Sequence, residues 1–390
     1  MMRIAAISDS HIDEKATAGG KLVLGPDGRS IRAVDRERCL KRAIEGAIDR
    51  KVDLIIHAGD LFERPKPTPA EYVIAEEALD MTMGLCPVVV CGCNHGMSQS
   101  PTEKHALAPL AGQQANLWVV LRPDLLLIET KSGLIQVAVL PFPQKSLLLA
   151  KEEYTGLSPE AANQVIGEKL VAIVRALRSR LDPALPSVLV SHMLIREAVF
   201  GSDRSPDASM LSMSAHDFEG FDLVIVGDIH RHQSVGERLV IPGSTDRMDF
   251  GEENEAKGWC CIELDGPGAV PRVELVETPA RRYLTYRDIA EAKAESFQSA
   301  DLTTDPIVRV KARVSQEEYD ALGPDLVRWR QYPLFQEEIE VTRQTTARSE
   351  AMTGDLTAEA AITEWHRANN RPEDLGELLV EHRRLAGAVT

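Results

Sequence analysis

Cysteine is scarce in this sequence, with six among 390 residues. Their spacing gives no pair of CxxC knuckles for a structural zinc, and they are too few for a disulfide scaffold in a chain of this length. Long apolar runs are lacking too, since no stretch approaches the roughly 20 residues that a membrane-spanning helix requires. The first residues reach an acid at Asp9, too early for a secretory signal. We therefore expect a reducing, cytoplasmic setting and no membrane partner.

Positive charge is also in deficit. The chain has 44 Lys and Arg against 60 Asp and Glu, which gives a formal net charge of −16. That is the wrong sign for a protein that holds DNA by bulk electrostatics. If the chain acts on nucleic acid, it must use local basic patches, bound metal ions or a partner. The hydrophobic fraction of 44% is that of an ordinary globular protein, long enough for two or three domains.

Short apolar strands alternate with amphipathic helices through the first part of the chain. We predict strands at 3–8, 52–57, 87–90, 117–121, 124–129, 134–140, 187–191, 222–227, 238–242, 258–264 and 272–277. We predict a hairpin over 21–33, helices at 35–50 and 159–181, and a helix that begins after Thr68 with a capping box to Glu71. Nearly continuous apolar strands are typical of sheets covered on both faces, so the pattern indicates an α/β core.

The pattern changes near 278–282, where a smaller unit is predicted to begin. It contains strands at 306–314 and 335–342 and a helix capped by Ser315. The tail is predicted to form two helices, at 358–368 and 372–386, each with an apolar stripe. These apolar helix faces must be buried against another surface. The helices either dock on their own domain or bind a partner.

Five predicted strands end in residues that can bind a metal ion. These are Asp9 with His11, Asp60, Asn94 with His95, His192, and Asp228 with His230. The carboxyl ends of strands in an open α/β sheet converge on one edge, so we expect these side chains to meet. Carboxylate, carboxamide and imidazole without thiolate suit a pair of divalent manganese, iron or zinc ions. Such pairs hydrolyse phosphate esters, and Asp60, in a tight turn after a strand, is the natural bridging ligand.

These residues resemble the motifs of a known family. The chain is similar to calcineurin-like metallophosphoesterases in Asp9-Ser10-His11, Gly59-Asp60-Leu61-Phe62, Asn94-His95, His192 and the Gly-x-Ile-His of 227–230. More narrowly, it resembles the SbcD-type nuclease subunit of the ATP-dependent DNA double-strand-break repair complex. That likeness lies in Gly59-Asp60-Leu61-Phe62, Ile229-His230-Arg231-His232-Gln233 and the stretch 242–259.

The resemblance implies a fold and a domain plan. The fold is an α/β four-layer sandwich, with two central sheets flanked by helices, a small α+β capping domain and a helical C-terminal tail. The metallophosphoesterase domain spans 1–280, the capping or DNA-binding domain 281–345, and the helical element that binds an ATPase subunit 355–390.

The resemblance also implies the roles of the site residues. One ion is held by Asp9, His11, Asp60 and His230, and the other by Asp60, Asn94, His192 and Asp228. His95 is not a ligand. It stabilises the scissile phosphate and protonates the leaving oxygen.

Two positions depart from the family pattern. Cys93 and Gly96 flank the Asn-His element, where the family has Gly and an acid, and Asp228 stands where the last signature has its first histidine. A carboxylate also binds manganese or magnesium, so we expect an altered but working second position. Cys91 and Cys93 are interpreted as small buried residues.

Other polar residues near these motifs are interpreted as DNA contacts or as structural residues. Arg231, His232 and Arg247 are candidates for contacts with DNA phosphates. His57 is interpreted as a core or supporting histidine, and Glu63 and Arg64 as a polar loop at the mouth of the site. Arg309, Lys311 and Arg313 alternate on one strand face, which is either solvated or the wall of a DNA groove.

The function predicted from the resemblance is a manganese-dependent DNA exonuclease or endonuclease. It acts as a homodimer with an SMC-like ATPase subunit of the SbcC type, in DNA repair and recombination. One alternative is a calcineurin-like phosphoesterase for a small phosphate ester or nucleotide. The other is a scaffold that binds DNA ends and has lost catalysis through Asp228 and Gly96.

Overall fold

The computed structural model describes residues 1–97, 103–145, 149, 154, 156–199, 210–295, 297, 301–342, 357–368 and 375–386. By its internal contacts the chain divides into two compact units. The first comprises Met1–Val310 with Arg328–Glu337, and the second Lys311–Val327 with Glu338–Thr390. The domain boundaries predicted at 280, 345 and 355 stay a prediction, and residues 343–356 lie outside the described ones.

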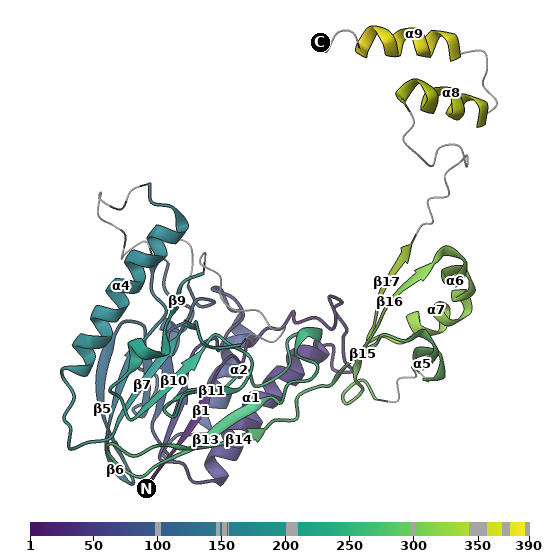
Figure 1. Ribbon diagram of the computed structural model, residues 1–390. Coiled ribbons are helices and arrows are strands. Elements are labelled where there is room, and N and C mark those ends of the chain that lie inside the picture. Colours follow the sequence, from purple (N-terminus) through teal and green to yellow (C-terminus); the bar gives the residue numbers. More distant parts are fainter. Residues whose placement is uncertain are drawn as a thin grey trace. The chain divides into compact units, whose positions relative to one another are not determined.

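The first unit is built on two mixed sheets of six strands each (Figure 1). In the first sheet the order is β14 (Arg272–Glu277), β13 (Gly258–Leu264), β1 (Met2–Ile7), β2 (Leu54–His57), β3 (Val88–Cys91) and β4 (Leu117–Val120). β1, β2, β3 and β4 are parallel, and β13 and β14 close the sheet in antiparallel register. The residues that follow β1, β2 and β3 therefore emerge at one edge.

The second sheet has the order β11 (Gln233–Val235), β12 (Leu239–Ile241), β10 (Leu223–Gly227), β7 (Ser187–His192), β6 (Gly133–Leu140) and β5 (Asp124–Thr130). β6, β7, β10 and β12 are parallel. Gly227, the last residue of β10, pairs with His192, the last residue of β7. The chain that leaves β10 therefore starts beside His192. The short strands β8 (Leu194–Ile195) and β9 (Ser212–Met213) form a separate pair.

Helices cover the outer faces of both sheets. α1 (Ile31–Asp49) and α2 (Pro69–Asp80) pack with the outer face of the first sheet in one apolar cluster. α4 (Pro159–Arg178) packs on the outer face of the second. A third cluster lies between the sheets and includes Ile4, Ile56, Val137, Val190 and Ile225. The order helix, sheet, sheet, helix confirms the predicted four-layer α/β sandwich, and Figure 1 shows α1 and α4 on its opposite sides.

The start of α1 differs from the prediction. The hairpin predicted over 21–33 is reduced to a single bridge between Leu24 and Ser30. The helix begins at Ile31, because the Ser30 side chain accepts hydrogen bonds from the backbone N–H groups of Arg32 and Ala33. The predicted caps of the two other helices are confirmed, with boxes from Thr68 to Glu71 and from Ser315 to Glu318.

The C-terminal part contains a three-stranded sheet in the order β15 (Tyr283–Tyr286), β16 (Ile307–Ser315) and β17 (Phe335–Thr342). Its helices are α5 (Ile289–Ala294), α6 (Gln316–Ala321) and α7 (Gly323–Arg330). The tail helices are α8 (Ala358–Ala368) and α9 (Leu375–Ala386), and residues 372–374 of the predicted second helix lie outside the described part. None of the helices described is both long and apolar enough to cross a membrane.

Candidate metal centre

The seven residues predicted to hold metal come together at the carboxyl ends of the central strands. Three overlapping groups have ligand atoms within 4.8 Å of one another: Asp9, His11 and His230; His11, Asp60 and His95; and Asp9, Asp60 and His192. Asp60 joins two of these groups. Its Oδ2 lies 3.8 Å from His11 Nε2 and 3.3 Å from His192 Nε2. Asp60 thus has the central place that a bridging ligand requires.

The remaining predicted ligands lie around His192. Asn94 Oδ1 is 3.0 Å from His192 Nε2, and Asp228 Oδ1 is 3.5 Å from the same nitrogen. Asn94 Nδ2 donates to Asp228 Oδ1 at 3.2 Å. The backbone N–H of Asp228 donates to Asp9 Oδ1 at 3.1 Å, which connects this set with the first. The Asp228 carboxylate therefore lies beside the other predicted ligands of the second metal position, although the family motif has a histidine at 228.

The backbone at these residues is unusual. Asp9, His11, Asp60 and Asp228 have positive φ, between 48° and 90°, which non-glycine residues rarely adopt. Backbone strain of this kind concentrates at functional sites. Gly59 has a φ of 107°, and a Cβ there would lie 2.2 Å from His192 Nδ1. Only glycine allows the turn before Asp60 to lie so close to that imidazole.

Three histidines present Nε2 to the cluster because their Nδ1 atoms contact oxygens outside it. His11 Nδ1 is 3.0 Å from Glu63 Oε2, and His230 Nδ1 is 2.7 Å from Glu252 Oε1. His192 Nδ1 donates to the carbonyl oxygen of Ala58 at 2.8 Å. In a neutral ring, a hydrogen bond donated by Nδ1 leaves Nε2 as the acceptor, and His230 and His192 have such a bond.

Divalent cations fit this arrangement. Asp9 Oδ2 and Asp60 Oδ1 are buried and have no hydrogen-bond partner. Buried carboxylate oxygens without a partner are costly unless a cation compensates them. Oxygen and imidazole ligands without thiolate are the set that manganese, iron or zinc accepts. The His and Asp clusters are therefore suited to hold divalent metal ions, and the identity of the metal is a separate question.

The ionisation of these groups reflects their crowding. Burial by itself raises the pKa of Asp60, but His192, His11 and His95 hold it well below its usual range. Burial opposes a charged His192, yet Asp60 and Asp228 outweigh burial and raise its pKa to about 10. Burial, together with the charges of Asp60 and Asp9, raises the pKa of Asp228 to about 6. Without a cation, protonated histidine offsets the buried carboxylates.

His95 lies at the edge of the cluster. Its side chain is 37% exposed, while that of Asp60 is 2% exposed. Nε2 is 3.8 Å from Asp60 Oδ2, and Nδ1 donates to the carbonyl oxygen of Glu63 at 2.8 Å. An imidazole fixed by Nδ1 and reachable from solvent is suited to meet a bound substrate with Nε2.

Gly96 is explained by its neighbour His105. A Cβ at Gly96 would lie 2.1 Å from His105 Cε1. The His105 ring occupies that space, with Nδ1 accepting from Leu107 N at 3.1 Å and Nε2 3.0 Å from the carbonyl oxygen of Cys93. Ala106 N also donates to the carbonyl oxygen of Gly96 at 2.8 Å. In this chain a histidine from a later loop braces the segment that carries Asn94 and His95.

A profile of the family described as calcineurin-like phosphoesterase matches residues 2–232. The chain belongs to this family. The match contains β1, β2, β3, β7 and β10, whose ends supply all of the predicted ligands.

Curated relatives of this phosphoesterase are distant. It is 22% identical over 325 residues to the DNA double-strand break repair protein Mre11 of Methanopyrus kandleri, an alignment that covers 80% of this chain and 65% of the relative. It is 22% identical over 218 residues to a subunit of the nuclease SbcCD of Staphylococcus epidermidis, covering 55% of this chain and 56% of the relative. The chain thus matches somewhat under two thirds of the length of these relatives.

Solved structures similar to this phosphoesterase include TT1561 of Thermus thermophilus, at 13% identity and a TM-score of 0.39. Another is a dimetal phosphatase from Danio rerio, at 9% identity and a TM-score of 0.35. Each similarity covers 70% of this chain and 98% of the other.

The residues predicted to contact DNA have differing surroundings in this phosphoesterase. Arg231 is exposed, and His232 Nδ1 is 3.0 Å from the carbonyl oxygen of Ile241. Arg247 donates to the carbonyl oxygens of Ala280, Arg281 and Glu255 at 2.7–3.2 Å. Its guanidinium thus holds chain segments together. A contact of these three residues with DNA stays a prediction.

The basic strand face has ionic partners. Lys311 pairs with Glu338, and Arg313 Nη2 is 2.8 Å from Glu340 Oε2. Arg309 lies over the Phe250 ring, 4.3 Å from its centre. These contacts favour the interpretation of a solvated, ion-paired strand face.

Sequence reasoning missed the residues that support the ligands. By sequence Glu63 belongs to a polar loop, yet its carboxylate contacts His11. Glu252 and Lys257 lie in the stretch 242–259, which marks the subfamily without giving either residue a role. Arg36 is, by sequence, one polar residue of a helix. The missing signal is spatial, because Glu252 meets His230 only through the fold.

Proposed function

We propose that this phosphoesterase is a manganese-dependent DNA nuclease subunit of an SbcCD-type repair complex. The observation that carries the proposal is the position of His95, a partly exposed imidazole beside seven buried or half-buried metal-competent residues. The distant likeness to Mre11 and to the SbcCD nuclease supports DNA as the substrate.

In this proposal some residues of the chain hold the metal ions and another residue donates a proton. Asp9, His11, Asp60 and His230 would hold one divalent cation, and Asp60, Asn94, His192 and Asp228 the other. When bound, such a pair supplies an activated water and neutralises charge on the phosphoryl oxygens. His95 directs Nε2 toward the substrate side and donates a proton to the leaving 3′-oxygen. The Glu63 carbonyl holds Nδ1 during this transfer.

A partner would explain the charge of the chain. A net charge of −16 repels the DNA backbone, so much of the DNA-binding surface is assigned to an SMC-like ATPase subunit. In α9, Leu378, Val380 and Leu385 are 44–65% exposed, and Arg383 Nε binds Glu359 Oε1 of α8 at 2.7 Å. We propose that this helix pair binds the ATPase subunit and that the nuclease subunit forms a homodimer. Deletion of 355–390 should abolish capture of the ATPase, and unchanged capture would refute the assignment.

The experiment that tests the nuclease activity compares three substrates in Mn²⁺: linear blunt DNA, hairpin DNA and bis-p-nitrophenyl phosphate. The proposal expects DNA to be cut, and His95→Ala to cut it far more slowly. Turnover of the small diester without DNA cleavage would instead favour a small-ester phosphoesterase. DNA binding without any hydrolysis, unchanged by Asp228→His, would favour the impaired scaffold.

A further inference from the structure

Two of the histidines in the cluster have the same surroundings, although they come from opposite ends of the family match. His11 and His230 lie 219 positions apart in the chain, and their Nε2 atoms are 3.1 Å apart. Each presents Nδ1 to a glutamate, Glu63 at 3.0 Å and Glu252 at 2.7 Å. Histidines that follow strands of different sheets thus face each other through Nε2, and each has a carboxylate at Nδ1.

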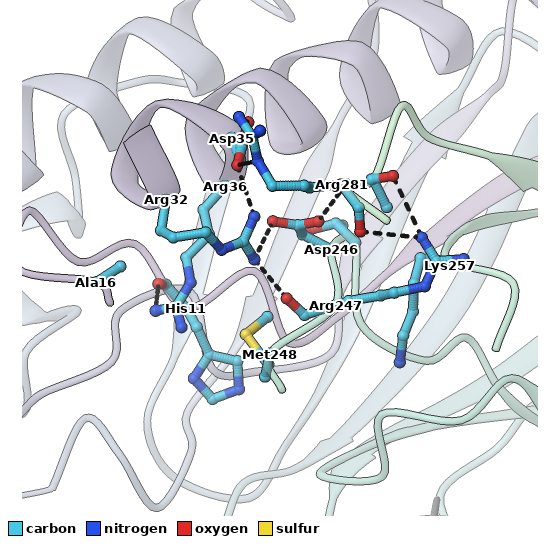
Figure 2. Close-up of polar contacts among 12 residues, drawn as sticks. His11, Ala16, Arg32, Asp35, Arg36, Asp246, Arg247, Met248, Lys257 and Arg281 are labelled. Carbon is cyan, nitrogen blue, oxygen red and sulfur yellow. Dashed lines mark hydrogen bonds and ion pairs between the residues drawn. The ribbon is translucent and has the colours of Figure 1, made fainter. Parts of the chain in front are cut away.

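Each glutamate is held by a cation that also binds the backbone of the same histidine. Arg36 Nη1 is 3.3 Å from Glu63 Oε2 and donates to the carbonyl oxygen of His11 at 2.8 Å. Lys257 Nζ is 2.8 Å from Glu252 Oε2 and donates to the carbonyl oxygen of His230 at 2.9 Å. Histidine ring, glutamate, cation and histidine carbonyl form a closed ring in both cases. Figure 2 shows Arg36 reaching His11.

Three of the four supporting groups are shielded from water. The exposed fraction of the side chain is 9% for Arg36, 10% for Glu252 and 0% for Lys257, while Glu63 is 32% exposed. Hydrogen bonds to charged groups are stronger where water is excluded, and they hold a ring in one orientation. α1 supplies Arg36, the turn after β2 supplies Glu63, and the segment between β12 and β13 supplies Glu252 and Lys257. The fold therefore uses four charged residues to orient two imidazoles.

His192 provides a contrast within the same cluster. Its Nδ1 bonds to the neutral carbonyl oxygen of Ala58. A carboxylate behind a metal-binding histidine fixes the ring and raises the basicity of the opposite nitrogen more than a neutral carbonyl does. The group formed by Asp9, His11 and His230 thus has two carboxylate-backed imidazoles, and the position around His192 has none.

We propose that Glu63 and Glu252 are positioning residues that direct His11 and His230 and make the Asp9–His11–His230 position the tighter of the two metal positions. The proposal rests on the metal ligands of the proposed function and not on DNA as the substrate. Its test measures Mn²⁺ binding without DNA. A protein that binds Mn²⁺ in the expected pattern but does not cut DNA would refute only the nuclease proposal.

The experiment titrates Mn²⁺ into the full chain and follows free Mn²⁺ by electron paramagnetic resonance. Glu63→Ala and Glu252→Ala should weaken the tighter binding step by roughly 10–100-fold. Glu63→Gln and Glu252→Gln keep an acceptor for Nδ1–H and should recover part of the loss. Side-chain nitrogen NMR of the parent loaded with diamagnetic Zn²⁺ should show His11 and His230 with the proton on Nδ1, and the alanine variants should lose that single form.

Glu255→Gln is the matched control. The Glu255 carboxylate also binds Lys257, at 2.7 Å, and the structure gives it no contact with His230. Its Mn²⁺ affinity should equal that of the parent, and thermal unfolding should show all variants folded. Alanine variants with parental affinity and an unchanged histidine spectrum would overturn the proposal. So would a loss in Glu255→Gln as large as that in Glu252→Ala.

Discussion

The His95 ring is held at one nitrogen, with Nδ1 donating to the carbonyl oxygen of Glu63 over 2.8 Å. The residue whose side chain binds His11 thus positions His95 through its backbone. The same short loop that supports a predicted metal ligand also directs the predicted proton donor. A change in the Glu63 side chain should leave the His95 contact in place, because that contact uses the main chain.

Removing the His95 imidazole should show whether it protonates the leaving group. His95→Ala should lower the cleavage rate of DNA by about 10²–10⁴-fold, the usual contribution of a general acid. The loss should be smaller on bis-p-nitrophenyl phosphate, because p-nitrophenolate leaves without a proton. His216→Ala, an exposed histidine paired with Glu219, is the control. Equal losses on both substrates would contradict the role.

Metal binding should release protons. With the site free of metal, the pKa of His192 is raised to about 10 and that of His230 to about 9, against burial, by neighbouring carboxylates. Both rings are therefore protonated at pH 7, and a cation must displace those protons. Affinity for Mn²⁺ should rise from pH 7 to 9, by up to about tenfold per unit for each proton released. Calorimetry in buffers of different ionisation enthalpy checks this, and identical heats would contradict it.

The space at Gly96 should be needed for activity. An added Cβ would lie 2.1 Å from His105 Cε1, so Gly96→Ala must move either the His105 ring or the loop with Asn94 and His95. A displacement of about 1 Å in such a loop can cost about 10²-fold in rate. Adding His105→Ala should restore part of the loss, because the clash is gone. Gly167→Ala, where a Cβ meets nothing within 4 Å, should be silent. Full activity of Gly96→Ala would contradict the prediction.

Helix α1 is tied to the site loops by a buried ionic network. Figure 2 shows Arg32 between Asp35 and Asp246, and both N–O distances are 2.7 Å. Asp35 also binds Arg281, whose Nη2 is 2.9 Å from Asp35 Oδ1. The side chains of Arg32 and Asp246 are at most 1% exposed. Removing one member of such a network leaves buried charge without its partner.

Arg32→Ala should therefore lower the free energy of unfolding by about 3–5 kcal/mol. Arg42→Ala removes an exposed pair with Glu45 on the same helix and should change it by no more than about 0.5 kcal/mol. Urea unfolding measures both. A loss below about 1 kcal/mol for Arg32→Ala would contradict the importance of the network.

The residue pattern was sufficient for an α/β core and for the gathering of the seven candidate ligands, and the family resemblance added the four layers. Strand ends in a parallel sheet share an edge, so Asp9, Asp60 and Asn94 had to lie close once their strands were recognised. The start of α1 was harder to predict. The sequence predicted a hairpin over 21–33 and a helix from 35, but Ser30 caps the helix, which begins at Ile31.

The contacts that support the metal-binding histidines could not be predicted from the sequence. Glu63 binds His11 across 52 positions, Glu252 binds His230 across 22, and Lys257 reaches a backbone carbonyl. No local periodicity encodes such pairs, because they depend on how loops from two sheets come together. The role of Arg247 in joining segments near 255 and 280 was hidden for the same reason.

The most direct measurement is the number of Mn²⁺ ions bound per chain, by equilibrium dialysis of the parent and of Asp60→Ala. Asp60 lies between both predicted positions, so the parent should bind about two ions and Asp60→Ala fewer than about one at the same free concentration. A parent that binds no Mn²⁺, or an Asp60→Ala variant that binds as many ions as the parent, would contradict the dinuclear centre.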